Sequence, residues 1–146
     1  MTVLTCPLCV ASGTVVFQGE KFRAIRADEP GFPAFYRVIW TAHVVEFSDL
    51  GLADRHRCMA AVNAVECALR AVLQPTKINL AALGNVVPHL HWHVIARFEW
   101  DSHFPAPVWA TAQRPVDGAA VTLLQAKLGE VDLTIQRALA ALCQAD

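Results

Sequence analysis

Polar and apolar residues alternate in the segment 89–93, His-Leu-His-Trp-His, and this alternation is the strongest local constraint on the fold. Successive side chains of a β-strand point to opposite faces of the sheet. A strand would therefore place the three histidines on one face, about 6.5–7 Å apart. Leu90 and Trp92 would take the other face and pack into the core. We therefore predict a strand at 90–98 that presents the imidazoles together.

Three imidazoles on one face have three interpretations. They can be exposed polar positions of a half-buried strand, although burying several without partners would be costly. They can form a zinc site, since His-x-His on a strand with a third histidine is a known zinc geometry. Alternatively, one neutral imidazole acts as a nucleophile on phosphorus, while its neighbours hold its tautomer and the phosphate oxygens.

Turn residues and periodicity predict the other elements. The long helix is indicated by apolar residues at helical spacing from Cys58 to Val72; Ser48 or Asp49 would cap it and Pro75 would end it. Besides the histidine strand, β-branched and aromatic residues predict strands at 14–18, 22–26, 35–40 and 77–83.

The last third of the chain has a different pattern. Residues 99–118 hold three prolines and two tryptophans, which indicates an irregular wall or lid. A second amphipathic helix is predicted at about 119–143. Strands come in groups and helices come singly. This favours an α+β fold with an antiparallel sheet of about five strands, one long helix and an additional C-terminal helix.

Length and composition limit the class of protein. A chain of 146 residues can form one domain, 1–146, with its own core. Charged residues interrupt every long apolar run, so no membrane partner is expected. The net charge of −1, with no basic stripe, argues against nucleic acid and leaves a small anionic substrate open. Five cysteines without a secretory signal predict a reducing, cytoplasmic location.

A C-x-x-C motif, Cys6-Pro-Leu-Cys9, stands near the start of the chain. Two thiolates at this spacing can hold one face of a zinc ion, and two imidazoles can close the tetrahedron. His43 and His89 are the candidate partners. A free, reduced pair near the surface is the alternative. A thioredoxin-like role is less favoured because no βαβ pattern surrounds the motif.

The segment 84–95, Gly-Asn-Val-Val-Pro-His-Leu-His-Trp-His-Val-Ile, resembles the signature of the histidine triad (HIT) family. Upstream, the segment 35–50 is similar to the family strand that ends in a histidine, here His43, before its helix. The segment 104–109, Phe-Pro-Ala-Pro-Val-Trp, resembles many bacterial members, among them proteins similar to diadenosine polyphosphate hydrolases. The resemblance covers about residues 6–109 and leaves the C-terminal helix outside.

The resemblance implies a role for each histidine. His91 would attack the α-phosphorus of a nucleotide and form a nucleotidyl-histidine that water resolves. His93 would bind phosphoryl oxygens and assist the leaving group, and the backbone carbonyl of His89 would orient the ring of His91. Asn85 would contact phosphate and Asp28 the ribose. No catalytic metal is required in this scheme.

The resemblance also implies a structural zinc ion on Cys6, Cys9, His43 and His89, which would fix the N-terminus to the strand of the active site. It further implies a homodimer. Nucleotidyltransferases of the superfamily carry Gln where His93 stands, so hydrolysis is favoured.

The chain departs from the family at two positions, which affects the choice of leaving group. Val86 replaces a Ser or Thr that donates toward the leaving group, and Phe35 replaces a further histidine. The substrate can be a dinucleoside polyphosphate, an adenylate or a nucleoside phosphoramidate. Two rival functions stay open: a non-catalytic zinc- or nucleotide-binding module, and a metal-dependent hydrolase in which His89, His91 and His93 hold the metal.

Overall fold

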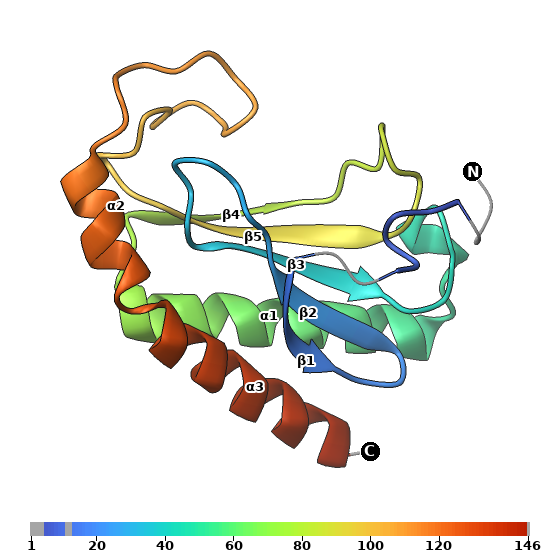
Figure 1. Cartoon of the computed structure of the whole chain (residues 1–146). Helices are drawn as coiled ribbons and strands as arrows, with labels where there is room; N and C mark the ends of the chain where they lie inside the picture. Colours follow the sequence, from blue (N-terminus) through green and yellow to red (C-terminus); the bar gives the residue numbers. More distant parts are fainter. Residues whose placement is uncertain (1–4, 11–12, 146) are drawn as a thin grey trace.

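A computed structural model describes residues 5–10 and 13–145, so the predicted domain 1–146 extends beyond the described residues. Its five strands form one antiparallel sheet in the order β1-β2-β3-β5-β4 (Figure 1). The strands are β1 Thr14–Gln18, β2 Phe22–Arg26, β3 Phe35–Trp40, β4 Lys77–Ala81 and β5 His91–Arg97. The helices of the described residues are η1 Phe47–Asp49, α1 Leu52–Leu73, α2 Gly118–Gln125 and α3 Leu128–Gln144. The predicted α+β class is confirmed.

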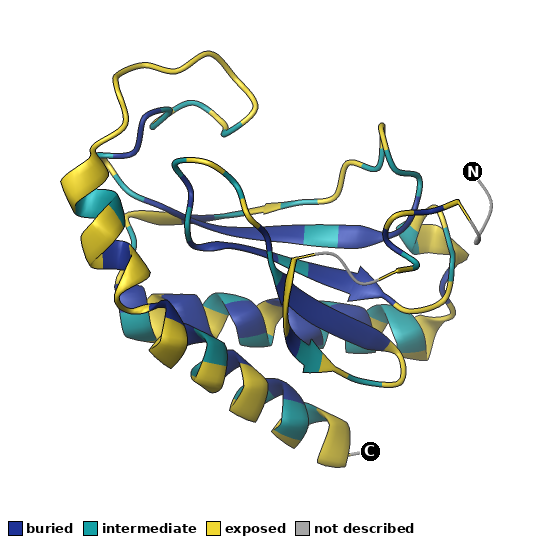
Figure 2. Ribbon diagram, in the orientation of Figure 1, coloured by how far each residue is buried: buried dark blue, intermediate teal, exposed yellow. Residues whose placement is uncertain are grey.

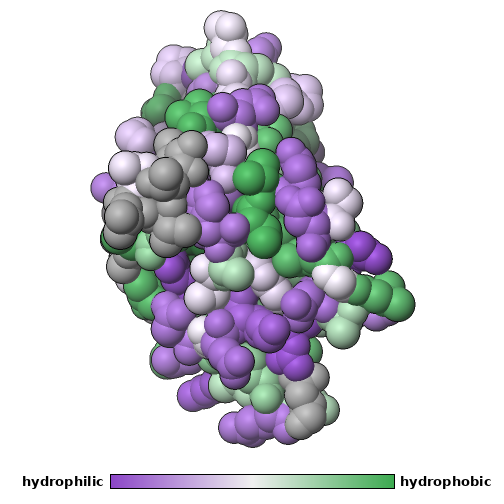
Figure 3. Space-filling model, turned by 90° about the vertical axis from the view of Figure 1, so that its right-hand side faces the viewer, coloured by the Kyte–Doolittle hydropathy of each residue, from purple (hydrophilic) through white to green (hydrophobic). Residues whose placement is uncertain are grey.

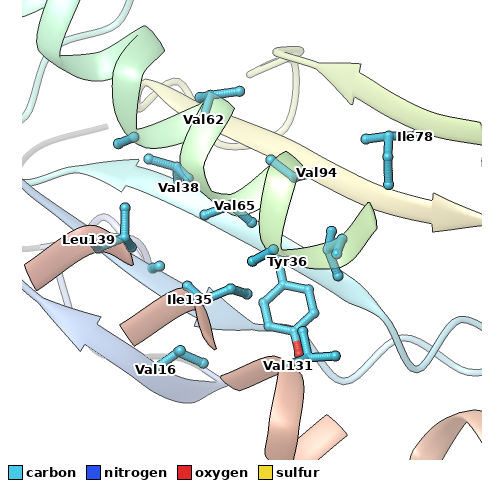
Figure 4. Packing of buried hydrophobic residues seen from close by; sticks show 14 of the residues in the cluster. Val16, Tyr36, Val38, Val62, Val65, Ile78, Val94, Val131, Ile135 and Leu139 are labelled. Carbon is cyan, nitrogen blue, oxygen red and sulfur yellow. The ribbon is translucent and has the colours of Figure 1, made fainter. Parts of the chain in front are cut away.

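Both long helices lie on one face of the sheet (Figure 1). Tyr36, Val38 and Trp40 alternate along β3 and point toward α1 and α3, where they join the main hydrophobic core. In Figure 4 the ring of Tyr36 lies among side chains of both helices, and its hydroxyl points toward Val131 of α3. Burying each large apolar side chain contributes about 1.5–3 kcal/mol, so this layer stabilises most of the fold.

The opposite face of the sheet carries loops and the N-terminal segment. Phe35 and Ile39 of β3 are buried there in two smaller apolar clusters. The central strands β2, β3 and β5 are therefore dark over most of their length in Figure 2, whereas the outer side of α3 is exposed. This second face, free of helices among the described residues, is where the histidines lie.

Element ends differ from the sequence prediction at α1. The N-cap is Gly51, and neither Ser48 nor Asp49 caps the helix. Asp49 instead closes the 3₁₀ turn η1, where its carboxylate accepts the backbone N–H of Glu46 at 3.0 Å. A carboxylate can satisfy the nearest free N–H of either turn, and spacing alone does not distinguish them.

The C-terminal region forms two helices where one was predicted. The chain bends at Ala126 and Lys127, between α2 and α3. Leu124 and Leu128 on the two sides of the bend are both buried in the main core. The apolar periodicity therefore continues across the break, which explains why the sequence pattern does not reveal it. Within the described residues, no helix has the length and apolar character needed to cross a membrane.

Candidate active site and metal centre

Strands β3 and β5 position the histidines by their register. His91 is paired with Ile39, and His93 is paired with Arg37. Because these residues occupy alternate positions, their side chains all point to the face without helices. His89 lies just before β5, where the chain is held by hydrogen bonds between Leu90 and the backbone of Val44 and Trp40. The predicted common face of the imidazoles follows from this arrangement.

The buried ring of His91 has a defined tautomer. Its Nδ1 lies 2.6 Å from the carbonyl oxygen of His89. A carbonyl can only accept, so Nδ1 carries the proton and Nε2 keeps its lone pair. Burial lowers the pKa of His91, the hydrogen bond to His89 opposes this, and the charge of Arg37 lowers it further. At neutral pH the ring is therefore a neutral imidazole with a free basic nitrogen.

His93 is enclosed by aromatic rings. Its ring centroid lies 4.8 Å from that of His91, 5.4 Å from Phe35 and 5.1 Å from Trp109, each in an edge-on arrangement. Burial, followed by the nearby His91 and Arg37, lowers the pKa of His93 to about 3. Its Nδ1 is buried and has no hydrogen-bond partner. His93 is therefore neutral at neutral pH, with one polar atom unsatisfied.

The segment between β5 and α2 forms an irregular wall beside His93. It is organised by a buried ion pair, in which Arg97 donates to both carboxylate oxygens of Asp101 at 2.8 and 3.0 Å. Asp101 also accepts backbone N–H groups of His103 and Phe104. These bonds fix the start of the segment that brings Trp109 against His93.

A second cluster of side chains lies at the start of β5. His89 donates from Nε2 to the carbonyl of Trp40 at 2.6 Å, so its Nδ1 is free to bind a metal. This Nδ1 lies 3.5 Å from Sγ of both Cys6 and Cys9 and 3.2 Å from Nδ1 of His43. The Cys9 Sγ to His43 Nδ1 distance is 3.3 Å.

These separations fit a tetrahedral zinc site. Zinc–sulfur bonds of about 2.3 Å and zinc–nitrogen bonds of about 2.0–2.1 Å give tetrahedral edges of roughly 3.3–3.8 Å. Cys6, Cys9, His43 and His89 therefore could hold a metal ion, as the sequence predicted. Zinc bound by four protein ligands would be closed to water and hence structural.

The cysteine segment is held in place by protein contacts as well. Arg23 donates from Nη2 to the carbonyls of Leu8 and Val10 at 2.6 and 3.0 Å. Cys6 and Leu8 also pack on Ile39 and Ile25 of the sheet. The cluster lies at the right of Figure 1, and Figure 3 views this end, where polar and apolar side chains are interspersed.

The histidine segment does not form the alternative three-histidine metal site. His89 directs Nδ1 to the cysteines and Nε2 to Trp40, so neither nitrogen faces a site shared with His91 and His93. Among the residues that the structure describes, the only group that could hold a metal is the cysteine–histidine cluster.

The other predicted site residues lie in loops outside the strands and helices. Asn85 and the 86% exposed Val86 lie in the turn before β5. Next to this turn, Gly84 and His91 line a hollow of about 230 Å³. Asp28 lines another hollow, together with Glu29, Gln125 and Leu128, and none of the three histidines lines it.

Two residues on the histidine face were not singled out from the sequence. Ala27, beside Asp28, belongs to the apolar cluster of Phe35 and Ile95 on this face. Arg37, directly opposite His93, places a cation there. The available signal for Arg37 was a charged residue in the middle of an otherwise apolar strand. A larger hollow of about 840 Å³ lies between the β1–β2 turn, α1 and the end of α3, away from the triad.

Comparisons with known proteins agree with this geometry. A family model described as HIT domain matches residues 10–100. The structure is similar to a histidine triad protein from Bradyrhizobium japonicum, with 28% identity, a TM-score of 0.65, and 80% of this chain and 87% of that chain covered. A histidine triad protein from Marinobacter aquaeolei has 22% identity and a TM-score of 0.67 over 88% and 89% of the chains.

A Zn-bound histidine triad family protein from Mycobacterium smegmatis has 21% identity and a TM-score of 0.61, with 99% of this chain and 100% of that chain covered. A comparison with curated proteins finds no match. The family-model match, together with these similar structures, supports a nucleotide-binding protein of the hydrolase or transferase kind. The chain belongs to the HIT domain family, as its match over residues 10–100 shows.

Proposed function

We propose that this protein hydrolyses a nucleotide at its α-phosphorus through a covalent intermediate on His91. Nε2 of His91 would form a bond to phosphorus while the bond from phosphorus to the leaving group breaks. Water would then attack the nucleotidyl-histidine, release a nucleoside monophosphate and restore the imidazole. His93 would contact the phosphoryl oxygens and pass a proton to the leaving group.

The observation that carries this proposal is the hydrogen bond from Nδ1 of His91 to the carbonyl of His89 at 2.6 Å. It fixes the tautomer in which Nε2 is the basic nitrogen, and burial keeps the ring neutral. An exposed, freely rotating imidazole would have neither property. This distinction favours a nucleophile over the rival reading of a module that only binds a ligand.

The cysteine–histidine cluster supports a structural, non-catalytic role for zinc in this proposal. Cys6, Cys9, His43 and His89 would hold zinc away from the reacting phosphorus, and the zinc-bound relative from Mycobacterium smegmatis is consistent with this. We also propose a homodimer, which rests on the family alone and which sedimentation analysis can test. The cytoplasmic location stays a proposal from the cysteine content of the sequence.

The test is a set of turnover measurements with dinucleoside polyphosphates, adenylates and nucleoside phosphoramidates, all in the presence of a chelator. His91→Ala should lower turnover at least about 10³-fold, because only binding and electrostatic effects would be left. His91→Gly with added imidazole should regain part of the transfer. A folded His91→Ala variant with near-native turnover would remove His91 from the mechanism.

A further inference from the structure

Arg37 is the one cation that β3 directs toward the histidines. It lies between Phe35 and Ile39 on the face without helices, directly opposite His93 on β5. Residues directly opposite each other on antiparallel strands have Cβ atoms about 4.5–5.5 Å apart. The Arg37 guanidinium also lies over the ring of Phe35, with 5.4 Å from Cζ to the ring centroid. It is therefore part of the lining around His93.

The hydrogen bonds of this guanidinium are incomplete. One terminal nitrogen, Nη2, donates to Oε1 of Glu29 at 2.7 Å. Nε, by contrast, is buried and has no partner. A buried N–H without an acceptor is destabilising, and such groups are rare in native proteins. The side chain as a whole keeps 23% of its surface exposed, so Arg37 is not sealed from solvent although its Nε is covered.

The neighbour of Arg37 has the same deficit. Nδ1 of His93 is likewise buried without a partner. These two unsatisfied polar groups lie on opposed residues, and one anionic ligand bound between the two side chains could interact with both. The planar guanidinium matches the geometry of phosphate oxygens and forms charge-assisted bonds with them. Glu29 occupies only the terminal nitrogen Nη2, so the guanidinium keeps further N–H donors for such an anion.

We propose that Arg37, together with His93, forms an anion subsite for a second phosphate group of the substrate. This inference rests on the proposed function, and it names the substrate class: nucleotides with a phosphoanhydride rather than a lone monophosphate or an amine leaving group. The leaving phosphate gains negative charge as its bond to the α-phosphorus breaks, and a fixed cation stabilises that charge most in the transition state.

Binding measurements test the subsite without turnover. We would titrate the protein with AMP and with the non-cleavable analogue α,β-methylene-ADP, and separately with inorganic phosphate and pyrophosphate. The native protein should bind the two-phosphate ligand of each pair at least about tenfold more tightly. Arg37→Gln should bring both ratios near one, and Arg37→Lys should keep part of the preference.

Arg26→Gln is the matched control. Arg26 also pairs with a carboxylate, that of Asp132, but it points to the helix face of the neighbouring strand β2. Its substitution removes the same charge and should keep the native ratio. Three outcomes would overturn the subsite. The native protein could show no preference for the two-phosphate ligands, Arg37→Gln could keep that preference, or Arg26→Gln could lose it to the same extent. Near-native turnover by His91→Ala would instead contradict the assignment of His91 as the nucleophile. The binding ratios do not depend on turnover, so they would test the subsite independently.

Discussion

Two histidines of the same motif carry their protons on different nitrogens. In His91 the Nδ1 proton is held by the carbonyl of His89, whereas in His89 the Nε2 proton is held by the carbonyl of Trp40. Each bond frees the other nitrogen: Nε2 of His91 as a base, and Nδ1 of His89 as a metal ligand. One backbone carbonyl per ring thus separates the proposed nucleophile from the candidate metal ligand.

His93 makes a residue-level prediction about pH. Its pKa is lowered to about 3 by burial and by His91 and Arg37, whereas an unfolded histidine titrates near 6.5. The unfolded state therefore binds the proton first, and stability is lost as pH falls below about 6.5. From pH 7.5 to 5.5 the free energy of unfolding should fall by about 1–1.5 kcal/mol from this group.

Urea denaturation of native protein and His93→Gln at both pH values measures this effect. Both proteins keep the four metal ligands, so any loss of zinc at low pH is common to them. The difference between the two pH dependences isolates His93. Equal slopes in the two proteins would show that His93 titrates normally in the folded state.

At the scale of elements, the start of β5 connects the cysteine–histidine cluster to the site of His91 and His93. The cysteine segment packs against β2 and β3 through Cys6 and Leu8, and His89 links it to the strand that carries His91. Arg23 holds the same segment without a metal. Zinc is therefore expected to reinforce an arrangement that is already formed, rather than to create it.

The prediction at this scale concerns zinc content and stability. Purified protein should contain about one zinc ion per chain, and removing it should lower the melting temperature by roughly 5 °C or more. Cys6→Ser and Cys9→Ser should each reduce the zinc content. Cys67→Ser is the control, because Cys67 is an exposed cysteine on α1. Metal-free native protein with an unchanged melting temperature would refute the structural role.

At the scale of the molecule, α3 is tied to the sheet by a polar contact within the apolar layer. Asp132 accepts from the hydroxyl of Tyr36 at 2.7 Å and from the guanidinium of Arg26 at 3.1–3.3 Å. Around it, Val131 and Ile135 are fully buried against the sheet and α1. This packing supports the prediction that the C-terminal region belongs to the same domain as the HIT region.

Asp132→Ala should destabilise the whole protein. It leaves the buried Tyr36 hydroxyl without its acceptor and Arg26 without its charge partner, at a cost of about 1–3 kcal/mol in the free energy of unfolding. Glu130→Ala, an exposed acid on the same helix, should change stability by less than about 0.5 kcal/mol. In a Tyr36→Phe background the cost of Asp132→Ala should be smaller; an unchanged cost would show that the hydroxyl bond does not stabilise α3.

The sequence by itself determined the local features of this protein. Strict alternation in 89–93 predicts a strand with three imidazoles on one face, because side chains of a strand alternate. Helical spacing from Cys58 to Val72 predicts α1 for the same kind of geometric reason. The C-x-x-C spacing and two spare histidines predicted the metal cluster. Each of these signals depends on residues close in sequence, or on a small number of residue types that bind zinc.

Only the tertiary structure decided which residues share a site. The register of β3 on β5 sets Arg37 opposite His93, and no local pattern encodes a pairing between strands more than fifty residues apart. The break between α2 and α3 is invisible because buried leucines continue across it. The fold also decides which hollow Asp28 lines: the loop after β2 meets Gln125 and Leu128 of the C-terminal helices there, and these helices lie far along the chain, so no local pattern around Asp28 indicates this neighbourhood.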